Sequence, residues 1–386
     1  MKQQPISRSS DILCLRSAKA DPSLRPYSNH RTIPLHNFFR LRGISLIELL
    51  VGMAIGLISL LVMLETFSAS TAHKLNTVSG ADATIASHIA LTLIQRDLLS
   101  AGSGLQVANC SEIRQIDSTE TVKTFTFPVT ITANTTLGSL NDRSDRIQIL
   151  STETAGMGSA ILTHRMLDPS SAMFATTAVG FEIDDIILLS EPGKECVTLQ
   201  LTQTPVWSGG KWLFVRAPSS PHNPPNSNNH YFPPGGYREG VGRILSLGSR
   251  GLLIDEYSLT YRNTNGSLPS SDLQVHRSDA NGSTTSEITR DVIALRAQYG
   301  WMNNATQTVS FRSDIPPGAT PNDLVAVRIG IVVRANQRDL SYTSPVEIRL
   351  FEDSNPITIT LSTDELKYRY RTFETVVPLR NTIWNR

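Results

Sequence analysis

Residues 44–64 read ISLIELLVGMAIGLISLLVML, and this stretch decides the fold. It contains one ionisable residue, Glu48, near its start. A helix of this length rises about 30 Å, which matches the hydrocarbon core of a bilayer. The sequence therefore predicts a membrane-spanning helix, and no second apolar run of comparable length follows it.

The charges on the two sides of this helix differ. Of the 35 basic and 34 acidic residues in the chain, residues 1–43 hold eight and two, which leaves 27 and 32 for the remainder. Arg40 and Arg42 directly precede the apolar run, so the positive-inside rule places the N-terminal side in the cytoplasm and the rest in the periplasm or outside. The acidic remainder gives no reason to predict direct nucleic-acid binding, which requires a basic face.

Residues 65–102 have the periodicity of an amphipathic helix. Their apolar residues recur at spacings near three and four, at Phe67, Leu75, Val78, Ile85, Ile89, Leu93 and Leu99. We expect one helix from about residue 44 to about residue 100, ended by the glycines within 101–104. The apolar stripe either packs on the chain's own head or forms a coiled-coil seam. Gly52 and Gly56 either allow close helix packing or soften the helix.

After residue 102 the pattern changes to short β-branched runs between Gly, Pro, Asn and Ser clusters. The expected strands are 124–131, 145–151, 181–189, 196–202, 212–216, 252–261, 292–299, 324–334, 346–351 and 368–379. The Pro- and Asn-rich segment 217–240 is expected to be an exposed loop, whose Tyr231, Phe232 and Tyr237 either contact a partner or pin the loop to the head. The fold class is α+β, with a long N-terminal α-helix packed on a large β-sheet-rich head, residues 103–386.

The cysteines also divide between the two sides. Cys14 precedes the apolar run, whereas Cys110 and Cys196 follow it. In an exported head the last two either form a disulfide or are unrelated buried thiols. No HExxH, GxSxG or P-loop motif occurs, so the sequence predicts no catalytic residue, no metal site and no cofactor. A signal-anchored exported enzyme, whose catalytic residues meet only in the fold, is the alternative from another class.

Residues 42–48, Arg-Gly-Ile-Ser-Leu-Ile-Glu, resemble the signature of type IV prepilins. The resemblance implies that a prepilin peptidase cuts after Gly43, removes residues 1–43 as a leader, and methylates the amine of Ile44. Residues 44–64 are then the transmembrane half of the mature helix and residues 65–102 its amphipathic half. The chain departs from the family in having Ile44 where Phe is usual, and in its long leader.

By this resemblance Glu48 is the fifth residue of the mature chain. A carboxylate inside hydrocarbon is unfavourable by roughly 3 kcal/mol, and such residues mark partners. In a filament of parallel helices, a stagger brings the Ile44 amine of one subunit near Glu48 of the next and so favours one register. Alternatively, Glu48 snorkels to the cytoplasmic interface.

Further segments resemble PilW-type minor pilins: residues 96–102 followed by Cys110, residues 291–300, 324–334 and 370–381. The resemblance implies a pilin-like, low-abundance subunit that helps start pilus assembly, sits near the pilus tip, and supports motility, adhesion or DNA uptake. The implied partners are other minor pilins, the major pilin, the prepilin peptidase, the inner-membrane assembly platform and a tip adhesin. The implied location is the inner membrane and then the cell-surface pilus. A J-type minor pseudopilin of type II secretion is the nearest alternative.

Overall fold

The computed structural model describes residues 45–105, 108–119, 121–133, 143–152, 158–218, 220–224, 230–262 and 270–383. The expected leader, residues 1–43, and the expected first mature residue, Ile44, lie outside the described residues. Contacts divide the chain into two units, Met1–Leu64 and Glu65–Arg386.

The first element is one long helix, α1 (Leu46–Ser100), with nearly the extent that the sequence predicts. Its sequence is rich in leucine, isoleucine and alanine and contains no proline, which favours a helix. The helix ends before Gly102 and Gly104, which have φ values of 74° and 77°. Residues with a Cβ rarely adopt this left-handed conformation, so these glycines form the helix end. The Gly102 N–H then donates to the Leu150 carbonyl, at 2.7 Å, which joins the helix end to the β region.

The described residues after α1 form β-sheets whose strands pair antiparallel, except for β1 with β8. Sheet A has the order β2 (Val122–Phe125), β1 (Ile113–Ile116), β8 (Cys196–Gln200), β7 (Ile186–Ser190), β11 (Arg243–Ser246) and β5 (Ser159–Ile161). Sheet B has the order β14 (Gly282–Thr289), β13 (Ser270–Asp279), β12 (Leu252–Arg262), β4 (Asp145–Thr152) and β3 (Val129–Ala133). Sheet C has the order β16 (Thr308–Arg312), β15 (Val292–Asn303), β17 (Leu324–Arg338) and β20 (Tyr368–Pro378).

Smaller elements complete the fold. Sheet D has the order β6 (Met173–Ala175), β10 (Lys211–Phe214) and β9 (Val206–Ser208). A separate hairpin consists of β18 (Glu347–Leu350) and β19 (Ile357–Thr360). The short helices are η2 (Pro321–Asp323), η3 (Glu365–Lys367) and α2 (Arg380–Ile383).

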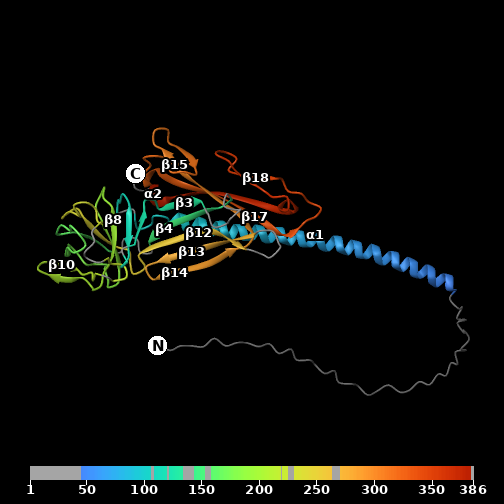
Figure 1. Ribbon diagram of the computed structural model, residues 1–386, viewed down its shortest axis with the longest axis horizontal. Coiled ribbons are helices and arrows are strands. Elements are labelled where there is room, and N and C mark those ends of the chain that lie inside the picture. The colour runs from blue at the N-terminus through green and yellow to red at the C-terminus, as the bar shows by residue number, and fades with distance from the viewer. Residues whose placement is uncertain are drawn as a thin grey trace, which may run out of the picture. The chain divides into compact units, whose positions relative to one another are not determined.

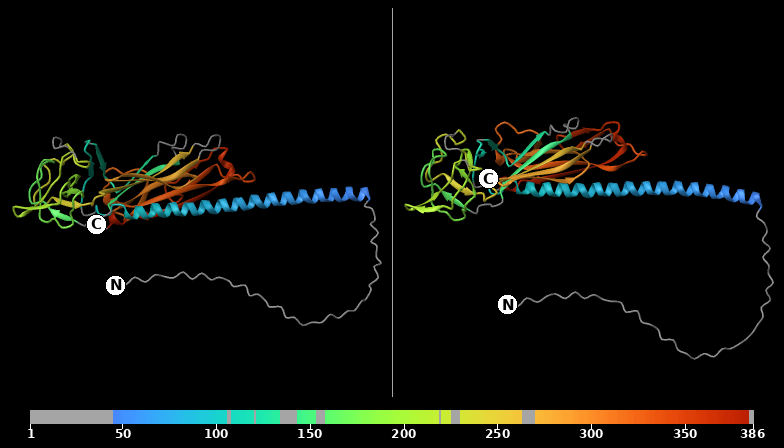
Figure 2. Two further views of the ribbon diagram at one scale, coloured as in Figure 1. Left: turned by 90° about the horizontal axis from the view of Figure 1, so that it is seen from below. Right: turned by 60° about the horizontal axis from the view of Figure 1, so that its bottom comes forward.

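The 65–386 unit has its cores at two ends. Sheets B and C pack on the C-terminal half of α1, and their shared core includes Leu98, Tyr257 and Val327. Figures 1 and 2 show these sheets beside that part of the helix. The β18–β19 hairpin covers the other face of sheet C through Leu350 and Ile359. Sheets A and D form the opposite end, green in Figure 1, around cores of their own.

The structure corrects several strand predictions. Residues 124–131 form two strands, β2 and β3, because the chain bends before Pro128, whose nitrogen has no hydrogen to donate. The strand expected at 181–189 begins only at Ile186, because Asp184 has a φ of 67° and Asp185 accepts the Glu182 N–H in a turn. The strands that the sequence did not indicate are β1, β5, β6, β9, β11, β13, β14, β16 and β19. Most are short, and β14 is almost entirely Ser, Thr and Gly, so they carry little apolar periodicity.

The segment 217–240 also differs from the expected exposed loop. In its described part, Tyr231, Phe232 and Tyr237 are buried in the core beneath sheets A and D. The Tyr237 hydroxyl donates to the Glu195 carbonyl at 2.8 Å. These aromatic residues therefore pin the loop to the head.

Candidate functional site

The N-terminal part of α1 is the first candidate site. Leu46–Ser68 is a 23-residue candidate membrane span with a mean hydropathy of 2.5 and no buried residue in its apolar window. Glu48 lies in its first turn, and within the described part of the chain no side-chain hydrogen bond or ion pair reaches the carboxylate. No atom lies within 4 Å of a Cβ built on Gly52 or Gly56. This segment is therefore an apolar surface with one carboxylate, open to lipid or to a neighbouring helix.

The C-terminal half of α1 is also apolar enough to be a candidate span, Thr77–Ser100, but this stretch is partly buried in the head. Its buried face consists of Ala83, Ser87, Ala90, Leu91, Ile94 and Leu98. These residues recur at helical spacing, and the small ones let the helix lie close to the sheets. Alanine and serine contribute little to a hydrophobic pattern, which is why the sequence points to another face.

The face that the sequence indicates is mostly turned away from the head. Val78, Ile85 and Ile89 are each at least half exposed, and Phe67 is exposed. Leu93 and Leu99 are half-buried, and the side chain of Leu75 lies outside the described residues. We call Val78, Ile85 and Ile89 the exposed stripe. Of the two alternatives given for the apolar stripe, packing on the chain's own head does not hold for these three residues, although Leu99 does pack against the core.

Asp97 fastens the end of α1 to sheet B. Its buried carboxylate accepts the Tyr257 hydroxyl at 2.6 Å and the Arg277 guanidinium at 3.3 Å. Arg96 contributes a third contact at 2.8 Å. Burial and the hydrogen bond to Asp97 raise the pKa of Tyr257 well above its usual value, so the phenol keeps its proton and donates. The helix end is thus fixed to β12 and β13 by a charged hydrogen-bond network.

We expect Asp97→Ala to lower the free energy of unfolding by about 2–3 kcal/mol, because it leaves the buried Tyr257 hydroxyl without its acceptor. Arg277 loses one of its two carboxylates and keeps Asp255, at 3.3 Å. Urea unfolding of the detergent-solubilised chain, followed by the fluorescence of the buried Trp301, measures this. Asp82→Ala, at an exposed position of the same helix, is the matched control and should change stability by less than about 0.5 kcal/mol. Equal effects of the two substitutions would contradict the role of Asp97.

A disulfide forms a second junction at the same end. Cys110 and Cys196 are bonded, with Cα atoms 5.6 Å apart. Cys196 is fully buried at the start of β8, where it pairs with Ile113 of β1. The bond therefore ties the chain leaving α1 to sheet A.

The Cys110→Ser, Cys196→Ser double variant is expected to lose stability by about 4 kcal/mol, since the 86-residue separation makes loop closure a large entropic term. Alkylation of the unreduced mature chain followed by mass spectrometry should label no cysteine, and should label two after reduction. Two alkylatable cysteines before reduction would show that the bond does not form in the cell.

The C-terminal segment meets the same helix end. Asn381 donates from its side-chain amide to the Ala101 carbonyl at 2.8 Å. A Cβ on Gly102 would lie 3.3 Å from Pro128 and 3.6 Å from Asn381, so this residue is closely surrounded. The Leu379 N–H donates to the Val325 carbonyl, which joins β20 to the start of β17. Residues 96–102, 324–334 and 370–381, which the sequence singles out separately, therefore converge on one junction.

Clefts on the 65–386 unit lie near these features. One of about 610 Å³ opens beside the disulfide and is lined by residues that include Phe125, Phe127, Asn109 and Asn381. Another of about 310 Å³ lies between Val78 and Arg290. In the described ranges, no group of three or more His, Cys, Asp or Glu side chains is placed to hold a metal ion. The features of the candidate site are thus an exposed apolar part of α1 and a junction that fastens the end of α1 to the β-sheets.

Comparison with known families gives a match to part of the head. Residues 257–381, which run from β12 to α2, match the family model PilW, described as type IV pilus-assembly protein W. No curated protein and no solved structure matches the chain significantly. The matched residues contain Tyr257, Arg277 and Asn381, the head's side of the contacts with the helix end. Residues 257–381 are therefore similar to the PilW family of type IV pilus-assembly proteins.

Proposed function

We propose that this protein is a minor type IV pilin that helps start pilus assembly and is then built into the pilus near its tip. It is made as a prepilin, cut between Gly43 and Ile44, methylated on the Ile44 amine, and held in the inner membrane by residues 44–64. The head faces the periplasm and, after assembly, the cell exterior.

The observation that carries this proposal is that the two parts of α1 differ in their surroundings. Its first part is an exposed apolar span with a single carboxylate, whereas its second part buries one face in a head whose residues 257–381 match the PilW family. A helix that is anchored in lipid at one end and structural at the other joins the membrane to an exported domain. A helix that only anchors an enzyme in the membrane would need the apolar span, but would not need a second part that packs in the head.

The exposed stripe supports assembly with other subunits. Val78, Ile85 and Ile89 extend the apolar surface of α1 beyond the span Leu46–Ser68. Helices of neighbouring pilins, either other minor pilins or the major pilin, are the partners we propose for it. The prepilin peptidase, the assembly platform and a tip adhesin are the other proposed partners.

Deleting the gene in the bacterium that carries it distinguishes a pilin from a J-type pseudopilin. We expect surface pili, counted by electron microscopy, and twitching motility to fall strongly, while secretion of folded exoproteins stays normal. Expression of the intact chain should restore both pilus phenotypes. Normal piliation together with lost secretion would instead favour the pseudopilin.

A further inference from the structure

The β9–β10 hairpin lies at the end of the 65–386 unit that sheets A and D form, where Figure 1 labels β10. Within the described chain, β9 pairs with β10 alone and is therefore an edge strand of sheet D. Its side chains are all exposed, with Val206 at 52% and Trp207 at 57%. Soluble proteins usually protect such edges with charge, so this apolar edge is unusual for a surface facing only water.

The hairpin is a projection with an anchored base. Gly209 and Gly210 form its turn with φ values of 57° and 82°, and nothing lies within 4 Å of a Cβ built on either. Trp212 packs on the core and contacts Trp207 edge to face, with ring centroids 5.3 Å apart. Neither cleft described above is lined by Val206 or Trp207. The apolar tip therefore protrudes, which suits insertion into a soft surface better than enclosure of a small ligand.

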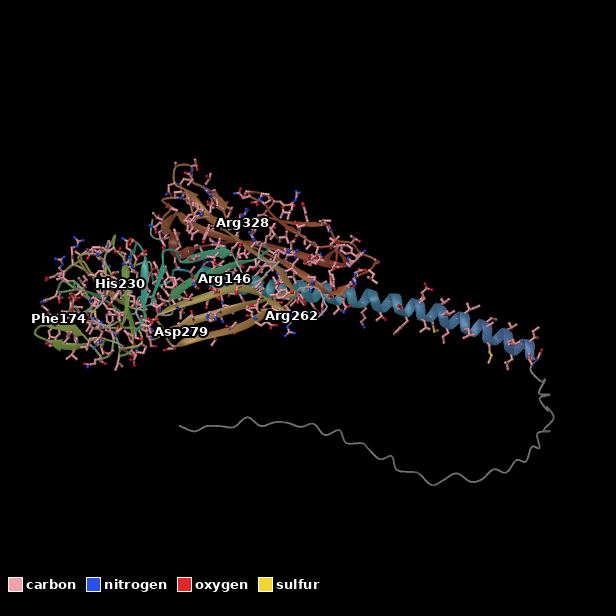
Figure 3. The ribbon with its side chains drawn as sticks, viewed as in Figure 1. Arg146, Phe174, His230, Arg262, Asp279 and Arg328 are labelled. Carbon is pink, nitrogen blue, oxygen red and sulfur yellow. A yellow bond between two sulfur atoms is a disulfide. The ribbon has the colours of Figure 1, made fainter. Side chains whose placement is uncertain are left out.

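A basic side chain lies beside the tip. Lys211 lies directly after the turn, and its ammonium is 3.1 Å from a ring nitrogen of His164. The His164 ring contacts that of Phe174, with ring centroids 5.2 Å apart, and Figure 3 labels Phe174 at this end of the head. Lys211 thus places a cation next to Trp207, and a cation beside an exposed aromatic residue suits an anionic surface.

We propose that the β9–β10 hairpin docks on an anionic lipid bilayer. Trp207 and Val206 enter the boundary between head groups and acyl chains, where tryptophan is favoured. Lys211 then faces the anionic head groups, which attract a nearby cation. This binding goes beyond the proposed function and does not depend on pilus assembly, but at a pilus tip it would give the pilus a direct contact with a target membrane.

The apolar part of α1 would itself enter the lipid vesicles used as the probe, so the test must first occupy it with another membrane. The full chain is therefore held through α1 in nanodiscs of phosphatidylcholine, which are immobilised on a biosensor by their scaffold protein. Vesicles of phosphatidylcholine, alone or with about one-third phosphatidylglycerol, are then passed over the surface. We expect the anionic vesicles to be captured more strongly than the neutral ones and than on empty nanodiscs, with capture falling as salt is added.

Trp207→Ser and Val206→Ser should each weaken capture of anionic vesicles, the first by at least about tenfold. Lys211→Gln should weaken capture of anionic vesicles only. Val309→Ser changes an exposed valine on another edge strand, β16, and should leave capture unchanged. Capture no greater than on empty nanodiscs, or capture unaffected by Trp207→Ser, would overturn the proposal. A protein that binds through Trp207 while vesicles do not would also overturn it.

Discussion

Replacing Gly43 with leucine is expected to leave the precursor uncut in the membrane. The prepilin resemblance implies a peptidase that demands a small residue at this position, so a leucine should clash by a few kcal/mol and lower the cleavage rate by at least about 100-fold. The head should still fold, because Cys110, Cys196 and Asp97 lie far along the chain from the cut. Pili should be lost, since the uncut chain has no free Ile44 amine.

The number of alkylatable cysteines distinguishes the uncut chain from the mature chain. Cys14 lies in the proposed leader, so the uncut chain should carry one alkylatable cysteine and the mature chain none. N-terminal sequencing of the wild-type protein should begin at Ile44. Gly80→Leu is the matched control, because nothing lies within 4 Å of a Cβ at that glycine, and its leader should be removed normally. A wild-type mature chain that still contains Arg42 would contradict cleavage after Gly43.

The parts of the fold that follow from local pattern could be predicted from the sequence. The extent of α1 follows from a long apolar run and from Gly102 and Gly104 after it. The strands β12, β15 and β17 were recognisable because they are long and rich in buried apolar residues. Strand β14 was not, because it is held by pairing with β13 across the turn at Gly282 and not by an apolar face of its own.

Within the candidate site, the disulfide could be predicted because the chain offers few possible pairings. With two cysteines after the apolar run, the Cys110–Cys196 pairing needed no knowledge of the fold. Asp97 has partners 160 and 180 residues away, so nothing in its local sequence identifies Tyr257 and Arg277. The packing face of α1 was misassigned because Ala83, Ser87 and Ala90 give a weaker signal than Val78, Ile85 and Ile89. Close packing selects small residues, and hydrophobic periodicity does not detect them.

Glu48→Gln is expected to abolish most piliation while leaving folding and leader removal intact. The substitution keeps the shape of the side chain and removes its charge. If the Ile44 amine of a neighbouring subunit pairs with Glu48 in lipid, loss of an interaction of about 3 kcal/mol weakens correct pairing roughly 100-fold. Insertion of the helix should not suffer, because the neutral amide is less costly in hydrocarbon than the carboxylate.

Electron microscopy of a chromosomal Glu48→Gln strain measures the outcome, with immunoblotting to show that the mature chain is present in normal amount. Glu65→Gln makes the same chemical change on α1 about 25 Å further along the helix, at the end of the apolar run, and should leave piliation near normal. The head's melting temperature should be equal in both variants, because Glu48 has no side-chain partner among the described residues. Normal piliation in the Glu48→Gln strain would mean that the carboxylate only snorkels to the interface, and that the subunit register is set elsewhere along the helix.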